Sequence, residues 1–306
     1  MQRHPRIELA RVHSARPQAG QGPAPVPGAP PQTALGTAPF EGLDAVFLCT
    51  PHGVASPFVR QALEAGARVV DLSADLRLKN LAAWEAAYGM PHPAPDLADA
   101  AIYGLTEHAR EAVKGARLVA NPGCYPSSVL LPLLPLLRAG LVGPGPIIAD
   151  AKSGVSGAGK GPSETTLYHN VAENFRAYGV GTHRHAPEIA EHAGSDRIVF
   201  VPHLLPCFRG ILSTLYVPPA PGVDAEQARQ VLAETYEQES LIQVLPEGVP
   251  AIRDVQNTPR CHIGLASAGG SLVIVSVLDN LLKGAASQAL QNMNLMLGCK
   301  ELEGLV

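Results

Sequence analysis

Short apolar runs separated by turn residues make up the first half of the chain. The run at 44–49 predicts a buried strand, 54–65 predicts a helix that ends at Gly66, and 68–72 predicts a second strand. A strand, a helix and a strand within about thirty residues are typical of a βαβ unit in a parallel sheet. We therefore expect an α/β, Rossmann-like nucleotide-binding fold in this half.

The second half alternates apolar and polar residues, as half-buried strands do. This pattern predicts strands at 198–201, 212–217 and 272–278, with a helix at 224–239. A long helix rich in small residues is expected to begin at Asp279. The second half should therefore form an α+β domain, with helices covering a mixed or antiparallel sheet.

The first forty residues lack the usual opening of a dinucleotide-binding domain, which is a strand, a Gly-rich turn and a helix. Residues 7–12 alternate like a strand, and 17–39 are rich in Pro, Gly, Ala and Gln, which predicts a mobile loop. The strand at 7–12 suits the second strand of such a domain, so the first strand and helix are expected to precede Met1. Arg16 would then contact the 2′-phosphate of NADP, unless it is an exposed loop arginine.

Composition narrows the function classes. The chain has 306 residues, 46% of them hydrophobic, which suffices for two domains with substantial cores. The net charge is −4 without a basic cluster, so nucleic acid is not an expected partner. The longest apolar run, 129–137, is too short to cross a membrane. Five scattered cysteines without a Cys-x-x-Cys pair favour a reducing cytoplasm.

The segment at 121–128 is expected to turn sharply from a strand at 118–120 into an apolar helix at 129–137. Cys124 would then lie near the N-terminus of that helix. The helix dipole and the unpaired backbone N–H groups there favour a thiolate and could hold an oxyanion. A buried structural cysteine is the alternative, but the turn favours Cys124 as a nucleophile.

Two histidines precede another predicted helix. Pro187 and Glu188 mark the helix start, so His183 and His185 are expected in the turn before it. No third ligand stands nearby at a suitable spacing, so we expect no metal. Imidazole takes and returns protons near pH 7, which favours an acid/base role beside a nucleophile. Glu188 could orient one of the rings.

Two further segments offer positive charge. The small residues 153–159 between Lys152 and Lys160 are either a flexible linker or a loop whose backbone N–H groups approach an anion. Arg209 stands just before a predicted strand, where its guanidinium would bind a carboxylate or phosphate, unless it is an ordinary loop arginine. The residues alone leave both alternatives open.

Seven motifs that span nearly the whole chain resemble those of N-acetyl-gamma-glutamyl-phosphate reductase, the arginine-biosynthesis relative of aspartate-semialdehyde dehydrogenase. They lie at 51–53, 71–77, 103–107, 121–126, 152–159, 183–189 and 279–286. The resemblance implies NADPH-dependent reduction of an acyl phosphate through a thioester on Cys124. It also implies a homo-oligomer, a dimer or a tetramer, and it favours His183 over His185 as the proton carrier.

The resemblance assigns roles to individual residues. The implied catalytic residues are Cys124, His183 and His185. The implied substrate-binding residues are Arg77, Ser153, Glu188 and Arg209. The implied cofactor-binding residues are Ser14, Arg16, Pro51, His52, Ser73, Gly157 and Asn280.

The resemblance also divides the chain. An NADP-binding domain is expected at 1–120 and 283–306, and a catalytic and dimerisation domain at 121–282. Family members begin with a Gly-rich turn that binds the NADP phosphates, and this sequence has none. The chain as given is therefore expected to bind NADPH weakly or not at all.

Three other functions stay open. A sister reductase of lysine biosynthesis would act on a longer or carrier-linked acyl phosphate. A Cys-His hydrolase would transfer the acyl group to water, although it would have no use for a nucleotide-binding half. A non-catalytic, truncated paralogue would only form mixed oligomers.

Overall fold

The computed structural model describes residues 4–13, 29–30, 32–34, 39–159, 164 and 167–306. The chain divides into two compact units. The first contains Met1–Leu76, Ala100–Asn121 and Ala289–Val306, and the second contains Arg77–Asp99 and Pro122–Gln288. The sequence division differs from this one mainly in 77–99, which groups with the unit that contains Cys124.

The first unit contains a four-stranded parallel sheet with the strand order β3-β4-β6-β5. Its strands are β3 (Ala45–Leu48), β4 (Arg68–Asp71), β5 (Ile102–Tyr103) and β6 (Leu118–Ala120). Helix α1 (Ser56–Glu64) connects β3 to β4, which confirms the predicted βαβ unit. The carboxyl ends of these parallel strands meet at one edge of the sheet, where open α/β sheets bind their ligands.

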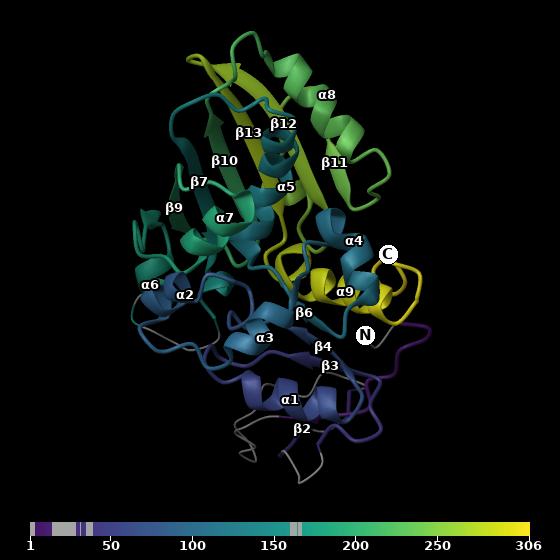
Figure 1. The fold of residues 1–306 in the computed structure, drawn as a ribbon. Helices are drawn as coiled ribbons and strands as arrows, with labels where there is room; N and C mark the ends of the chain where they lie inside the picture. The colour runs from purple at the N-terminus through teal and green to yellow at the C-terminus, as the bar shows by residue number, and fades with distance from the viewer. Residues whose placement is uncertain (1–3, 14–28, 31, 35–38, 160–163, 165–166) are drawn as a thin grey trace. The chain divides into compact units, whose positions relative to one another are not determined.

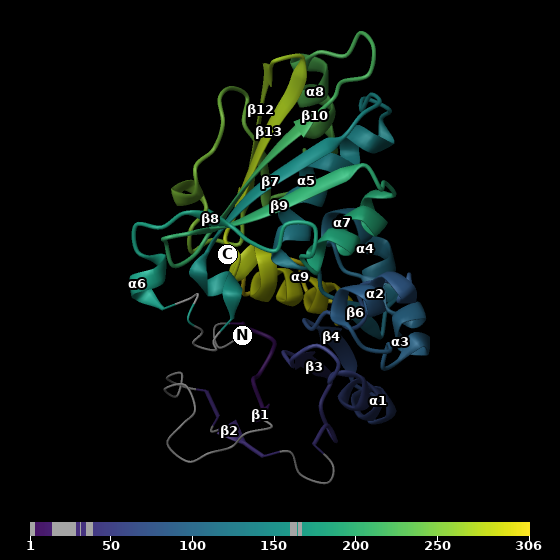
Figure 2. The same ribbon diagram turned by 90° about the vertical axis from the view of Figure 1, so that its left-hand side faces the viewer.

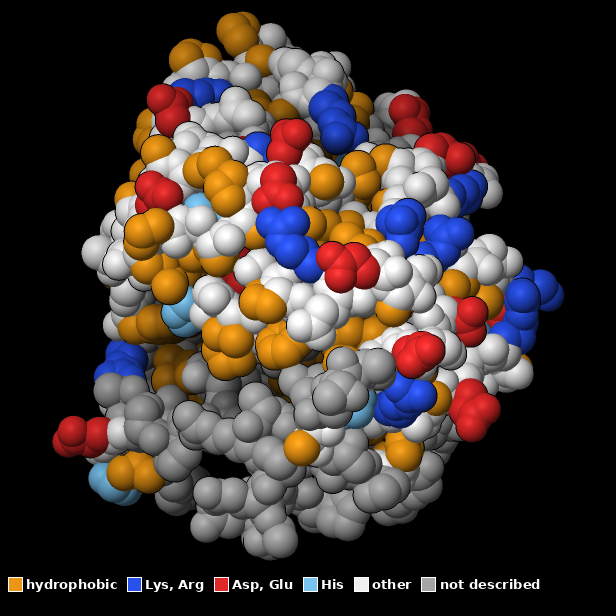
Figure 3. Space-filling view, turned by 60° about the horizontal axis from the view of Figure 1, so that its bottom comes forward, with side chains coloured by type: hydrophobic (Ala, Val, Ile, Leu, Met, Phe, Trp, Pro, Cys, Tyr) orange, Lys and Arg blue, Asp and Glu red, His pale blue; other side chains and the backbone are white. Residues whose placement is uncertain are grey.

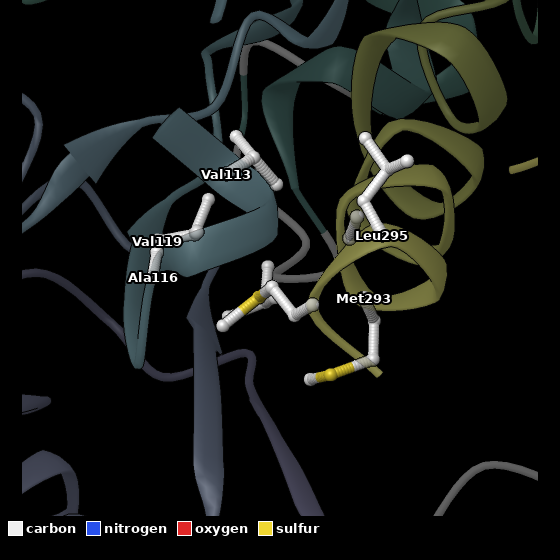
Figure 4. Close-up of a cluster of buried hydrophobic side chains, with 8 residues drawn as sticks. Val113, Ala116, Val119, Met293 and Leu295 are labelled. Atoms are coloured by element: carbon white, nitrogen blue, oxygen red, sulfur yellow. The ribbon is translucent and has the colours of Figure 1, made fainter. Parts of the chain in front are cut away.

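The core of the first unit joins segments that lie far apart in the sequence. Val70 of β4 and Val119 of β6 are fully buried against Val113 of α4 (Thr106–Gly115). Met293 of α9 (Ser287–Met296) completes the cluster (Figure 4). The C-terminal segment Ala289–Val306 therefore packs into the core of the first unit.

The predicted strand at 7–12 is wrong. Only Val12 of it is in a strand, β1 (Val12–His13), which pairs in parallel with β2 (Gln32–Thr33) in a separate sheet. His4 turns the chain before this point, because its Nδ1 accepts hydrogen bonds from the backbone N–H groups of Arg6 and Ile7. The predicted loop at 17–39 lies mostly outside the described residues.

The second unit contains a seven-stranded sheet with the strand order β11-β12-β13-β10-β7-β9-β8. Its strands are β7 (Ile147–Gly154), β8 (Arg176–Ala177), β9 (Ile198–Leu205), β10 (Ile211–Val217), β11 (Ile242–Val244), β12 (Cys261–Ala268) and β13 (Ser271–Leu278). The β7–β9 and β11–β12 pairs are parallel and the other pairs are antiparallel. The sheet is therefore mixed.

Three helices cover one face of this sheet (Figure 1): α5 (Cys124–Arg138), α7 (His185–Ala193) and α8 (Ala225–Thr235). Figure 2 shows the opposite face, on which none of these helices lies. Helix α5 is buried along most of its length because it packs against the sheet and both other helices. Among the helices that the structure describes, none combines the length and the apolar character needed to cross a membrane.

Shorter helices complete the second unit. They are α2 (Leu81–Tyr88), α3 (Pro95–Ala100), α6 (Tyr168–Val171), two 3-10 turns (Val155–Ala158 and Ile252–Asp254) and a π-helix (Leu282–Ala286). The predicted helix start at Asp279 is wrong. The carboxylate of Asp279 accepts hydrogen bonds from the N–H groups of Leu281 and Leu282, so a turn precedes the π-helix and α9.

Candidate active site

Cys124 stands at the predicted turn from a strand into a helix. Strand β6 ends at Ala120 and α5 begins at Cys124, with Gly123 as its N-cap. The Gly123 N–H donates to Glu188 Oε1 at 2.8 Å, and the Gly123 carbonyl accepts from the backbone N–H of Ser127 at 3.0 Å. A carboxylate from α7 and the first turn of α5 therefore fix the backbone beside the half-buried thiol.

Glu188 also binds Arg77, through Oε2 and Nη1 at 3.3 Å, and its side chain is only 2% exposed. The buried carboxylate thus joins the backbone at Cys124 to a cation. A Cβ atom on Gly123 would lie 2.6 Å from His185 Nε2 and 2.9 Å from Arg77 Nη1. A larger residue at 123 would therefore displace the His185 ring or the Arg77 guanidinium.

The thiol of Cys124 is not an activated thiolate in this state. Burial, assisted by the Glu188 carboxylate, raises its pKa to about 11, although Arg77 and the backbone N–H groups of Tyr125 and Cys124 oppose this shift. The expected effect of the helix N-terminus is present, but burial outweighs it. Cys124 therefore needs a base to remove its proton.

Both histidines are neutral at pH 7. Burial and the nearby Arg77 cation hold the pKa of His185 well below its usual value. Burial, assisted by Arg184, lowers the pKa of His183 to about 4, although Glu188 opposes this shift. A neutral imidazole can accept a proton, so either ring has the required charge state. Among the described residues, no three His, Cys, Asp or Glu side chains are placed to hold a metal.

The surroundings of the two rings differ. His183 is enclosed edge-to-face by Tyr125, Tyr178 and Phe200, with ring centroids 5.4–5.6 Å away. Its Nδ1 accepts the backbone N–H of His185 at 3.1 Å, so a neutral His183 carries its proton on Nε2. His185 is the first residue of α7, two positions earlier than the sequence predicts, and its Nε2 lies against Gly123. This contact favours His185 as the group beside Cys124.

The segment at 153–159 is not a flexible linker, and several of its backbone N–H groups already have partners. It forms the end of β7 and a 3-10 turn. The N–H groups of Gly154, Val155 and Ser156 donate to the carbonyls of Gly210, Cys207 and Phe208. These three donors are therefore not available to an anion.

Ser153, Gly157 and Asn280 lie close together in the second unit. Ser153 is buried, and a Cβ atom on Gly157 would lie 2.7 Å from its Oγ. Asn280 accepts the N–H of Gly210 at 2.7 Å and donates to Ser156 Oγ at 3.0 Å. The structure thus brings together two predicted cofactor-binding residues and one predicted substrate-binding residue, whose roles stay predictions.

Arg209 is held by its neighbours. Its Nε and Nη2 bind both oxygens of the fully buried Asp279 at 2.7 and 2.9 Å, and its Nη1 donates to Asn257 Oδ1 at 2.8 Å. It is therefore not an ordinary solvated arginine. Substrate binding by Arg209 stays a prediction. The ion pair with Asp279 neutralises most of the guanidinium charge.

The other predicted cofactor-binding residues belong to the first unit. Pro51 and His52 follow β3 and are exposed, and Ser73 follows β4 and donates to Asp71 Oδ2 at 2.7 Å. The N–H groups of Gly53 and Ala55, at the start of α1, donate to the Asp75 carboxylate at 2.6 and 3.1 Å. The Asp75 carboxylate therefore occupies the position before α1 where an anionic ligand would otherwise accept these hydrogen bonds. Ser14 and Arg16 lie outside the described residues.

Several residues beside Cys124 escaped the sequence interpretation. Tyr125 and Tyr178 enclose His183, and a Cβ atom on Gly284 would lie 2.8 Å from Cys124 Cβ. Tyr125 and Gly284 stand within the motifs that carry the resemblance, which is a signal for them. Tyr178 stands in no motif, and nothing in the sequence distinguishes it.

Similarity to known proteins extends over most of the chain. A family model described as "Semialdehyde dehydrogenase, dimerisation domain" matches residues 124–280, and one described as "Semialdehyde dehydrogenase, NAD binding domain" matches 1–116. The chain is 49% identical over 278 residues to the probable N-acetyl-gamma-glutamyl-phosphate reductase, chloroplastic, of Arabidopsis thaliana. This alignment covers 88% of this chain and 69% of that protein. It is 46% identical over 319 aligned positions to N-acetyl-gamma-glutamyl-phosphate reductase of Neisseria meningitidis. This alignment covers 99% of this chain and 90% of that protein. The chain belongs to the N-acetyl-gamma-glutamyl-phosphate reductase family.

Family membership confirms the resemblance carried by the seven motifs. The fold is also that of a solved structure, aspartate semialdehyde dehydrogenase II from Vibrio cholerae, with a TM-score of 0.67 at 20% identity over 87% of this chain and 83% of that chain. This likeness concerns the fold alone. It confirms the expected combination of a Rossmann-like parallel sheet and a second domain built on a mixed sheet.

Proposed function

We propose that this chain reduces N-acetyl-L-glutamyl 5-phosphate with NADPH, giving N-acetyl-L-glutamate 5-semialdehyde and phosphate in arginine biosynthesis. The relatives that share nearly half of its residues are named for this reductase activity. The observation that carries the proposal is the arrangement at Cys124. A cysteine at a helix N-terminus lies beside a neutral histidine and a buried arginine, as thioester chemistry requires.

In the proposed first half-reaction, His185 takes the proton of the Cys124 thiol. The thiolate attacks the acyl carbonyl, the C–S bond forms, and the bond between that carbon and the phosphate oxygen breaks. Arg77 stabilises the thiolate and the developing oxyanion because its guanidinium lies at the same turn. The N–H groups at the start of α5 point toward the same charge.

When bound, NADPH supplies the hydride that reduces the thioester carbonyl. The C–S bond of the tetrahedral intermediate then breaks as its oxyanion becomes the aldehyde carbonyl, and His185 returns its proton to the departing Cys124 sulfur. We propose that Pro51, His52 and Ser73 hold the nucleotide, since the carboxyl edge of a parallel sheet fits such a ligand. Asp75 occupies the N-terminus of α1, so the pyrophosphate does not bind there.

The test is the reverse reaction of the purified chain, followed as NADPH formation from N-acetylglutamate semialdehyde, phosphate and NADP. We expect phosphate-dependent turnover with a preference of about tenfold or more over the homologue with one further methylene group. The opposite preference would support the lysine-biosynthesis alternative. Acyl transfer to water without NADP at a comparable rate would support a hydrolase instead.

We further propose that the chain forms a homodimer, or a tetramer built from such dimers, through the face of the seven-stranded sheet without helices. The strand register places one row of side chains across this face: Ala266, Val273, Tyr216, Ile148 and Val199. Ile148, Tyr216 and Val199 are 38%, 40% and 48% exposed. The family model over this region describes a dimerisation domain, which supports a second copy as the partner.

Val199→Asp and Tyr216→Asp should each weaken assembly, because an interface would have to bury an unpaired carboxylate. We expect the dissociation constant to rise about a hundredfold or more. Light scattering coupled to size exclusion, at a series of dilutions, measures this directly. Val54→Asp is the matched control, since Val54 is 44% exposed in the first unit. Equal oligomer size for all variants would contradict the proposed interface.

Nucleic acid is not a proposed partner. On the face drawn in Figure 3, the Lys and Arg side chains of the described residues are dispersed among Asp and Glu side chains. Dispersed charge does not form the basic stripe that a phosphate backbone needs. We propose a cytoplasmic location, because the five cysteines all lie within the described residues and none of them forms a disulfide.

A further inference from the structure

The segment at 77–80 follows the turn at 73–76 in the first unit and forms neither a helix nor a strand. Arg77, the cation beside Cys124, is its first residue. A segment without regular structure cannot rely on a helix or sheet ladder to fix its backbone. Its position depends on the side chains that bind it.

Those side chains come from one face of α7, at positions i, i+3 and i+4. Glu188 pairs with the Arg77 guanidinium, as described above. Glu191 accepts the backbone N–H of Lys79 at 2.7 Å with Oε1, and that of Asn80 at 3.0 Å with Oε2. His192 Nε2 lies 2.7 Å from the Arg77 carbonyl oxygen.

His192 is the donor in this last contact, because a carbonyl oxygen can only accept. Its Nε2 therefore carries a proton. Burial lowers the pKa of His192, although the contact with the Arg77 carbonyl opposes the shift, so the ring is neutral near pH 7. A neutral ring with a fixed tautomer holds the Arg77 backbone in one position.

We propose that Glu191 and His192 are positioning residues that hold the Arg77 guanidinium against the turn at Cys124 and thereby set the reactivity of the thiol. The inference rests on the proposed role of Cys124 as the nucleophile. Helix α7 would then supply three things to the site. They are His185 beside Cys124, the Glu188 carboxylate that binds the backbone of Gly123, and the two residues that position the Arg77 cation.

The segment has other anchors beyond Arg77, so a change at 191 or 192 should act locally. Lys79 Nζ donates to the carbonyls of Ala98 and Asp99. Asn80 caps α2 by accepting the N–H of Ala83 at 3.1 Å. These bonds are made by the side chains of Lys79 and Asn80 and do not involve α7, so they should keep the segment attached while the backbone beside Arg77 shifts.

The direction of the effect follows from the charges around Cys124. Arg77 lowers the pKa of the thiol and Glu188 raises it. The two histidines are neutral, and burial raises the pKa of Tyr125 and Tyr178, so these phenols are neutral as well. Loss of Arg77 from its position would leave Glu188 as the charge nearest to the thiol, and the thiol would ionise less readily.

The experiment measures the rate of iodoacetamide alkylation of Cys124 from neutral to alkaline pH, with the modified cysteine identified by peptide mass spectrometry. In His192→Leu and Glu191→Ala the rate at a fixed pH below the thiol pKa should fall about three- to tenfold, because thiolate fraction falls tenfold for each unit of pKa. His192→Gln keeps a donor to the Arg77 carbonyl and should restore most of the rate. Glu237→Ala, at an exposed glutamate of the same unit, is the control.

An unchanged alkylation profile in either folded variant would overturn the proposal. If the melting curve shows that His192→Leu does not fold, Glu191→Ala decides, since the anchors of Lys79 and Asn80 remain. Half-buried Cys299, in the other unit, serves as the internal reference within each sample. Alkylation needs neither substrate nor cofactor, so failure of the proposed reaction would appear in the turnover assay while the alkylation result stood by itself.

Discussion

Replacing Cys124 by alanine is expected to abolish phosphate-dependent oxidation of the semialdehyde and leave the fold intact. The thioester bond requires sulfur, and no other thiol takes its place, so turnover should fall by about four orders of magnitude or more. The fold should survive because Glu188 binds the backbone of Gly123 rather than the thiol. Alanine also keeps the Cβ atom against which Gly284 packs.

Initial rates and a melting curve for Cys124→Ala measure both parts of this expectation. Cys124→Ser should be nearly as inactive, since an alcohol is barely ionised where a thiol already needs a base. Cys299→Ala, at another half-buried cysteine, should keep its activity. Substantial residual turnover by purified Cys124→Ala would end the thioester mechanism.

His185→Asn should produce the second largest loss, about a hundred- to ten-thousand-fold in turnover, which is the usual contribution of a general acid/base. The Cys124 thiol has a pKa of about 11 and must lose its proton to a neighbour. The neutral His185 ring presses its Nε2 against the residue before that cysteine. Its loss should therefore slow thioester formation and the return of the proton alike.

His183→Asn is the matched comparison and should cost less. His183 gives its Nδ1 to the backbone N–H of His185 and fills the space between Tyr125, Tyr178 and Phe200. Its replacement should disturb the position of His185 rather than remove the proton acceptor. Turnover and the pH profile of each variant separate the two roles. A larger loss for His183→Asn would restore the preference that the family resemblance gives.

Features set by neighbouring residues were predictable from the sequence. The βαβ unit follows from local apolar runs, and the turn at Cys124 follows from Pro122 and Gly123 beside an apolar helix. A strand also needs a neighbouring strand to pair with, and the alternation at 7–12 does not show whether one exists. The prediction of a strand there was therefore wrong. The turn at Asp279 is held by the N–H groups of Leu281 and Leu282, and Arg209, distant in the sequence, fixes the same carboxylate.

The chemistry of the site was predictable in kind but not in arrangement. The motifs identify Cys124, His183 and His185, because these residue types carry acyl-transfer chemistry. The order of the two histidines depends on which ring meets Gly123, and that contact forms only when α7 packs beside α5. The raised pKa of the thiol is also a property of the packed structure, since its first cause is burial.

Tyr125, the residue after the nucleophile, donates its hydroxyl to the backbone carbonyl of His203 in β9 at 3.0 Å. The side chain of His203 lies on the other side of that strand, with Asp150 Oδ1 3.1 Å from its Nδ1 on the face proposed for dimerisation. If both proposals hold, the active site and the dimer interface lie on the two sides of one strand. A subunit bound to the helix-free face would then contact the strand whose carbonyl holds the Tyr125 hydroxyl, and assembly could affect the position of that ring.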